Sequence, residues 1–197
     1  MRPFLLLVSG PPASGKTTLA RLLAGRLGWP LLGKDSFKEA LFDSLGVGDA
    51  DWSRRLSEAA FARQSEAADR ILARGGSLVI EGNFRAAHRP ALAALAARHG
   101  AVLAQVACRA SPATLAARRA ARANTADRHA GHLDRIAGAA CVDDPYAPLA
   151  SEPTVLYDGD GPLPDAQALD AMLAALSAPG CDRSRSASCR SPWRAGS

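Results

Sequence analysis

One loop near the N-terminus restricts the fold of this chain more than any other feature of the sequence. It reads Gly10-Pro11-Pro12-Ala13-Ser14-Gly15-Lys16-Thr17, follows the apolar run at 4–9, and precedes an amphipathic stretch that ends near Leu27. An apolar run, a glycine-bounded loop and a helix form the start of a βαβ unit. Glycines let such a loop turn so that successive backbone N–H groups point at an anion. The sequence therefore predicts an α/β fold with an anion site at the start of its first helix.

The loop matches GxxxxGK[ST], the P-loop or Walker A pattern. In this pattern the lysine, here Lys16, reaches the β- and γ-phosphates of a nucleotide, and the hydroxyl of Thr17 ligates Mg²⁺. We therefore expect ATP and Mg²⁺ as cofactors, with Lys16 in a catalytic role. The expected nucleotide-binding residues here are Gly10, Ala13, Ser14, Gly15, Lys16, Thr17 and Thr18. A glycine-rich turn with an incidental lysine is the alternative, and the strand–loop–helix context argues against it.

Further apolar runs alternate with amphipathic stretches, which is the βαβ rhythm of a parallel sheet. The predicted strands are 4–9, 30–33, 77–81, 102–108 and 154–157. The predicted helices are 15–27, 36–45, 52–73, 88–99, 111–123, 126–139 and 164–176. We expect one domain over residues 1–177 and a disordered tail rich in serine and arginine over 178–197.

Charge and cysteine content narrow the class of protein. Four arginines and one aspartate in residues 178–197 carry +3 of the formal net charge of +5, so the body is nearly neutral, which disfavours nucleic acid as a partner. The four cysteines show no CxxC pair and no zinc spacing. No apolar run approaches the roughly 18 residues of a membrane span, and the run at 4–9 is too short for a secretory signal. A cytoplasmic protein is expected; its oligomeric state is left open.

The second predicted strand leads into Lys34-Asp35-Ser36-Phe37-Lys38-Glu39. Because the carboxyl ends of parallel strands face the ligand crevice, we expect Asp35 to accept the proton of a substrate hydroxyl that attacks phosphorus. Ser36 and Glu39 have the spacing of a capping box, which would leave Asp35 just outside the helix. Lys38, one turn into the helix, is expected to bind polar groups of the substrate. The alternatives are a helix cap for Asp35 and a solvated surface position for Lys38.

The third predicted strand ends in Glu81, followed by Gly82 and Asn83. An acid after four apolar residues has the position of a Walker B carboxylate, which orients Mg²⁺ or its water. The usual aspartate is replaced here by glutamate, and a cap on the following turn is the alternative. Asn83 and Arg85 are expected to open toward the substrate. The helix at 52–73 is expected to cover the same pocket, with Ser57, Arg63 and Gln64 lining it or facing water.

A basic segment, 118–135, is interpreted as a short helical lid. Arg118 and Arg122 share a helix face. Charge that develops on a transferring phosphoryl group favours guanidinium donors from such a lid, so Arg122 and Arg128 are the expected catalytic arginines. Arg118 is expected to stack on adenine or to bind the β-phosphate. Ordinary surface arginines are the alternative. His129 and His132 fit a lid or substrate role better than a zinc site.

Taken together, these segments resemble the small P-loop kinases of the AAA-type predicted-kinase group related to chloramphenicol phosphotransferase and zeta-toxin-type kinases. The resemblance spans about residues 4–160 and rests on GPPASGKTT, LLGKDSFKEALFDSLG, LVIEGNF and CRASPATLAARRAARANTADRHAGHLD. It implies a P-loop NTPase three-layer sandwich with a five-stranded parallel sheet of order 2-3-1-4-5 and a short helical lid. It also implies ATP and Mg²⁺ at the P-loop and an acceptor hydroxyl near Asp35. Since the group is diverse in substrate, the resemblance does not name the acceptor.

The sequence thus predicts an ATP-dependent phosphotransferase that moves the γ-phosphate of ATP to a hydroxyl of a small molecule. A first alternative is a 5′-hydroxyl polynucleotide kinase, which the near-neutral body and the 5% aromatic content disfavour. A second is a nucleotide-binding regulatory ATPase without an acceptor, in which Asp35, Lys38 and the lid arginines would have little purpose. The absence of an Asn-Lys pair argues against a GTPase.

Overall fold

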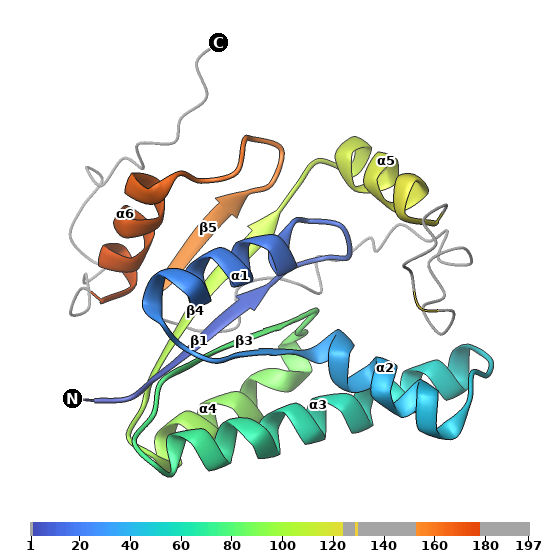
Figure 1. Ribbon diagram of the computed structural model, residues 1–197, viewed down its shortest axis with the longest axis horizontal. Helices are drawn as coiled ribbons and strands as arrows, with labels where there is room; N and C mark the ends of the chain where they lie inside the picture. The colour runs from blue at the N-terminus through green and yellow to red at the C-terminus, as the bar shows by residue number, and fades with distance from the viewer. Residues whose placement is uncertain (1, 124–128, 130–152, 178–197) are drawn as a thin grey trace.

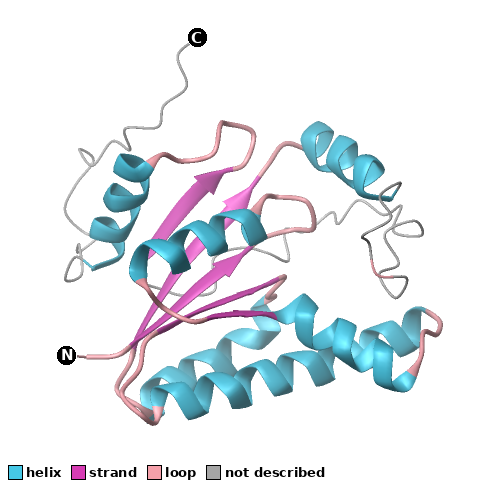
Figure 2. Ribbon diagram, viewed as in Figure 1, coloured by secondary structure: helices cyan, strands magenta, loops and turns pink. Residues whose placement is uncertain are grey.

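Five parallel strands form a single sheet at the centre of the protein. The computed structural model describes residues 2–123, 129 and 153–177 (Figures 1 and 2). The strands are β1 (Phe4–Ser9), β2 (Leu31–Gly33), β3 (Leu78–Gly82), β4 (Val102–Arg109) and β5 (Thr154–Asp158). They pair in the order β2-β3-β1-β4-β5, and every pairing is parallel. The predicted fold class and strand order are therefore confirmed.

Helices cover both faces of the sheet, which gives three layers (Figure 1). They are α1 (Lys16–Leu27), α2 (Lys34–Leu45), α3 (Ala50–Leu72), α4 (Arg89–Arg98), α5 (Pro112–Ala123) and α6 (Ala166–Ser177), with a short 3-10 helix η1 (Ala86–His88). Alternate residues of β1 point to opposite faces. Leu6 and Val8 pack with α1 and α6, whereas Leu5 and Leu7 pack with α3 and α4. Burial on both faces explains why β1 is a continuous apolar run.

Helix α2 begins earlier than the sequence indicates, and this changes the position of Asp35. Gly33, the last residue of β2, is its N-cap, and no side chain caps the helix. The predicted capping box of Ser36 and Glu39 is therefore wrong. Because the three-residue β2 leads directly into α2, Asp35 lies inside the first helical turn, where an acid interacts favourably with the helix dipole.

Helix α3 also begins before its predicted start. Asp49 is the N-cap, and its side chain accepts a hydrogen bond from the backbone N–H of Trp52 at 2.8 Å.

The predicted helix at 126–139 and the tail at 178–197 lie outside the described residues, and the division into a domain and a tail stays a prediction. In the described part of the chain, no helix is long and apolar enough to span a membrane.

Candidate functional site

The loop between β1 and α1 has a backbone that few side chains tolerate. Ala13 has a φ of 73°, which makes it the one non-glycine residue with positive φ in the described ranges, and Gly15 has a φ of 88°. A Cβ atom on Gly10 would collide with the backbone oxygen of Cys108. The hydroxyl of Ser14 is buried and has no hydrogen-bond partner within the described part of the chain. The glycine positions of the motif are thus required by backbone geometry. The buried Ser14 hydroxyl is available to hydrogen-bond a ligand.

Lys16 and Glu81 meet at the end of the central strands. Glu81 lies beside Val8 in the pairing of β3 with β1, and its Oε1 is 3.8 Å from the Lys16 Nζ. Burial raises the pKa of Glu81 above its usual value, while the Lys16 charge and a hydrogen bond from Thr17 oppose this shift. Burial thus disfavours the charged form of Glu81 more than Lys16 and Thr17 stabilise it, and a bound cation would stabilise it further.

The donors at this point fit Mg²⁺. Glu81 offers a buried carboxylate and Thr17 a hydroxyl, and both are oxygen ligands of the kind that a hard cation prefers. The described residues contain no group of three His, Cys, Asp or Glu side chains that could hold a metal. Mg²⁺ suits such a sparse site, because it usually keeps several waters and takes other ligands from substrate phosphates.

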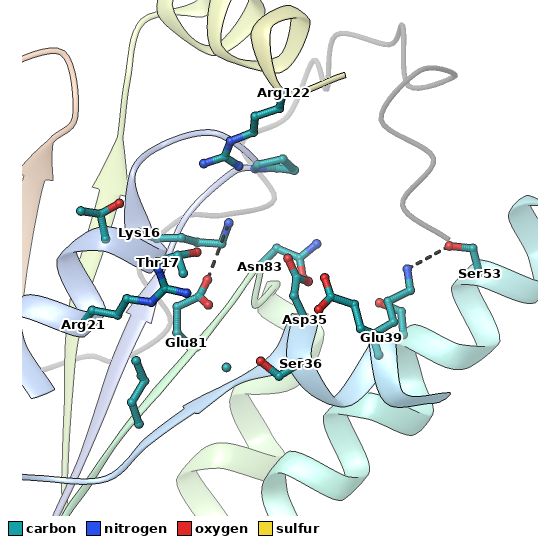
Figure 3. Close-up of a pocket in the computed structure, with 16 residues that line it drawn as sticks. Lys16, Thr17, Arg21, Asp35, Ser36, Glu39, Ser53, Glu81, Asn83 and Arg122 are labelled. Carbon is teal, nitrogen blue, oxygen red and sulfur yellow. Dashed lines mark hydrogen bonds and ion pairs between the residues drawn. The ribbon is translucent and has the colours of Figure 1, made fainter. Parts of the chain in front are cut away.

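A cavity of about 590 Å³ opens beside Lys16 and reaches α2 and α3 (Figure 3). It brings together many of the predicted site residues, namely Lys16, Thr17, Thr18, Asp35, Lys38, Glu81, Asn83 and Arg122. Figure 3 shows the P-loop residues and Glu81 on one side, Asp35 and Glu39 on the other, and Asn83 between them. The P-loop and the predicted substrate residues of α2 therefore face one common space.

Among the predicted site arginines that the structure describes, Arg118 and Arg85 do not line this cavity. Arg118 donates to the backbone oxygens of Gly159 at 2.8 Å and Ala13 at 3.4 Å, so it links the P-loop to the loop after β5. Arg85 is exposed, and its backbone N–H donates to Nδ1 of His88 at 2.9 Å. The structure thus does not bring Arg85 to the predicted place. Arg128 lies outside the described residues, as does His132.

Helices α2 and α3 are joined across the cavity wall. Asp35, Lys38 and Glu39 share one face of α2, and the Lys38 Nζ donates to the Ser53 Oγ at 2.9 Å. Ser57 lies one turn further along α3 on the same face as Ser53. The two helices therefore present facing stripes of polar side chains to the same space.

Lys34 lies beneath this surface. It is buried, and its Nζ donates to the Asn83 Oδ1 at 3.3 Å. Burial lowers its pKa, and the charges of Glu58 and Asp35 oppose that shift. Lys34 thus helps to fix the orientation of the Asn83 side chain.

Gln64, whose role the sequence left open, is a buried structural residue. Its Nε2 donates to the backbone oxygens of Leu32 at 2.7 Å and Glu81 at 2.9 Å. One side chain therefore ties the ends of β2 and β3 together. Ser57 lines the cavity, and Arg63 faces solvent in an ion pair with Glu66 at 2.8 Å.

Several lining residues were missed by sequence reasoning. Arg21 and Glu39 each lie four residues after a predicted site residue, Thr17 and Asp35, and the helical repeat was a usable signal for both. Ser53 had no such signal, because its position depends on how α3 packs against α2.

His129 stacks on Phe42 of α2, with ring centres 5.5 Å apart, and its Nε2 lies 3.0 Å from the Asp43 Oδ1.

A parallel sheet of this order, with a P-loop after its central strand and an acid at the end of the adjacent strand, defines the fold of the small P-loop kinases. The sequence comparison identifies the particular family. The chain belongs to the AAA domain family AAA_33, which matches residues 5–139. No curated protein shows a significant sequence match.

Solved structures agree with this assignment. A protein of Chloroflexus aurantiacus J-10-fl that is described as a putative kinase is 37% identical with a TM-score of 0.70, over 80% of this chain and 89% of that chain. The APS kinase of Mycobacterium tuberculosis in complex with AMPPNP and APS is 22% identical with a TM-score of 0.60, over 90% and 99% of the two chains. A sugar kinase from Janibacter sp. HTCC2649 is 16% identical with a TM-score of 0.58, over 88% and 94%. The last two similarities concern the fold alone.

Proposed function

We propose that this protein is an ATP-dependent kinase that transfers the γ-phosphate of ATP to a hydroxyl of a small molecule. The carrying observation is the single cavity that Lys16 of the P-loop shares with Asp35 of α2. A nucleotide-binding protein without an acceptor needs no carboxylate opposite its phosphate loop. The 37% identical Chloroflexus protein, which is described as a putative kinase, supports the same class of activity.

The proposed nucleotide site begins at the P-loop. The backbone N–H groups of Gly10 and of residues 13–18, together with the ammonium of Lys16, bind the phosphates of ATP. Pro11 and Pro12 have no N–H to contribute. Glu81 and Thr17 would hold a Mg²⁺ ion, which would supply positive charge that neutralises the phosphates. Arg118 closes the nucleotide end, because it already bridges the P-loop and the loop after β5.

The proposed acceptor site lies across the cavity. The acceptor hydroxyl gives its proton to the Asp35 carboxylate as its oxygen attacks the γ-phosphorus. The bond from that phosphorus to the β,γ-bridging oxygen breaks, and ADP leaves. Arg122, which lines the cavity from α5, stabilises the negative charge of the phosphoryl group. Lys38 and Asn83 orient the acceptor. Arg128 is proposed to assist Arg122, on the sequence argument alone.

The test is transfer of labelled γ-phosphate from ATP to a panel of hydroxyl compounds. Lys16→Ala should abolish transfer and weaken ATP binding. Asp35→Asn should leave ATP binding near wild type and lower kcat about 10²- to 10⁴-fold, the usual contribution of a general base. Asp51→Asn is a matched control, because Asp51 is exposed at the start of α3 and lies outside the cavity. Full activity in Asp35→Asn would contradict the assigned base. Label on a 5′-hydroxyl oligonucleotide alone would favour a polynucleotide kinase.

A further inference from the structure

The acceptor end of the cavity has a chemical character that the proposed reaction alone does not require. Among the described residues that line the cavity, apolar side chains are confined to Pro12 and Leu31, and none is aromatic. The nearby rings of Phe42 and Phe84 are buried, with 2% and 0% exposure, so they present no face to a ligand. A planar aromatic acceptor would lose water here without gaining a stacking or apolar contact.

Polar groups instead surround this space on two helices. Asp35 and Glu39 contribute carboxylates from α2, and Ser53 and Ser57 contribute hydroxyls from α3. Asn83 adds an amide at the end of β3. Carboxylates accept hydrogen bonds from hydroxyls, and amides and serines both donate and accept. Such a set satisfies a ligand that carries several hydroxyl groups.

The charges on this side disfavour an anionic acceptor. Lys16, Arg21 and Arg122 lie toward the P-loop and Glu81 (Figure 3). We call the cavity lining that α2 and α3 contribute the α2–α3 wall; its described residues are Asp35, Ser36, Lys38, Glu39, Ser53 and Ser57. Lys38 is the cation among them, and its ammonium donates to Ser53. A carboxylate or phosphate on the acceptor would stand against both Asp35 and Glu39, and like charges that lie close together repel strongly in a partly dehydrated pocket.

We propose that the acceptor is a non-aromatic polyhydroxylated molecule without anionic groups, namely a neutral or aminated sugar or cyclitol. This inference rests on the proposed kinase function and assigns Glu39 and Ser57 to acceptor specificity. The cavity of about 590 Å³ fits a small molecule. Because the triphosphate occupies the P-loop end, the acceptor fills only the α2–α3 end.

The test has two arms that separate this inference from the function it rests on. The first measures transfer of labelled phosphate from ATP to glucose, glucosamine and myo-inositol, and to gluconate, glucose 6-phosphate and adenosine. The second measures binding of the same six probes by saturation-transfer NMR in the presence of AMPPNP and Mg²⁺, and it needs no transfer. Label on the first three probes, or their binding, supports the proposed class.

Variants at the α2–α3 wall make the assignment specific. Loss of a charged hydrogen-bond acceptor in Glu39→Gln should raise the KM for the polyol about tenfold, and Ser57→Ala should raise it about threefold, with kcat and the KM for ATP little changed. Glu66→Gln is the matched control, since Glu66 lies on the exposed side of α3 in ion pairs with Arg63 and Arg70.

Preference for gluconate, glucose 6-phosphate or adenosine in either arm overturns the inference. Failure of all three polyols to bind beside AMPPNP overturns it as well. Binding of a polyol that Glu39→Gln weakens, without any phosphate transfer, contradicts the proposed kinase function but supports the chemistry assigned to the pocket.

Discussion

Gly159 shows how closely single residues are fitted around the nucleotide end of the site. Its backbone N–H donates to the Arg109 oxygen at 2.6 Å, and its own oxygen accepts from Arg118 at 2.8 Å. A Cβ atom at this position would collide with the backbone oxygen of Ser14 in the P-loop and would lie 2.9 Å from the Arg109 oxygen. The loop after β5 can therefore touch the P-loop only with a glycine here.

Gly159→Ala should push that loop away from the P-loop. We expect a loss of stability of about 1–3 kcal/mol, as for other overpacked sites, together with weaker ATP binding. Gly161→Ala is the control, because its Cβ would meet the Asp158 oxygen at an ordinary 3.7 Å. Thermal unfolding and ATP titration calorimetry measure both effects. Equal behaviour of the two variants would show that the close approach is unimportant.

His88 makes stability depend on pH. Burial lowers its pKa, the Lys34 charge lowers it further, and Glu58, whose Oε2 lies 4.0 Å from its Nε2, opposes both. The unfolded chain takes up this proton near pH 6.5, whereas the folded protein does so only at lower pH. The unfolded state thus binds more protons in this window, and stability falls as the pH drops through it.

His88→Gln should remove part of that dependence. Between about pH 7.5 and pH 5.5, a range that brackets the ordinary histidine pKa, the melting temperature of the variant should decrease less than that of the wild type. Melting curves at several pH values in one buffer of constant ionic strength provide the measurement. Parallel pH dependence in the two proteins would contradict the assignment.

At the scale of elements, Gln64 fixes the relative position of β2 and β3. The end of β2 leads into Asp35 and the end of β3 carries Glu81, so one amide from α3 aligns both halves of the site. Gln64→Leu should lower the free energy of unfolding by about 1–3 kcal/mol, because the buried oxygens of Leu32 and Glu81 lose a donor. It should also lower kcat. Gln167→Leu is the control, because Gln167 is exposed on α6. Urea unfolding and kcat are measured for both variants. A loss of stability with kcat near wild type would show that Gln64 has a purely structural role.

The elements were largely predictable because their signals are local. The continuous apolar run of β1 and the glycine-bounded loop before α1 each determine a structure within a few residues. The start of α2 was not predictable in the same way. Ser36 and Glu39 have the spacing of a capping box, but the short β2 leads into the helix at Gly33 before that signal can act.

The site was predictable where it depends on the ends of strands. Lys16, Asp35 and Glu81 share the carboxyl edge of the sheet, and the topology of a parallel sheet brings them together. Ser53 depends instead on the packing of α3 against α2. Arg85 lies beyond the end of β3, at the N-cap of η1, and is exposed, so the ends of the strands do not determine the position of its side chain.

At the scale of the whole molecule, the protein should not need its last twenty residues. Helix α6 ends at Ser177, and its final core residue, Leu176, is 3% exposed. Removal of residues 178–197 should therefore leave the melting temperature and ATP affinity unchanged. It should abolish any oligonucleotide binding at low salt, because the segment carries four of the arginines. Oligonucleotide binding that persists after truncation would assign it to the body of the protein and would favour nucleic acid as a partner.

The strand order has an evolutionary consequence. The P-loop extends from β1, which lies in the middle of the sheet and is buried on both faces. The α2–α3 wall follows β2, a strand of three residues at the edge. After gene duplication, one copy could acquire a new acceptor through changes in this helical hairpin while its ATP chemistry is preserved. Directed evolution that is confined to residues 35–57 would exploit the same separation.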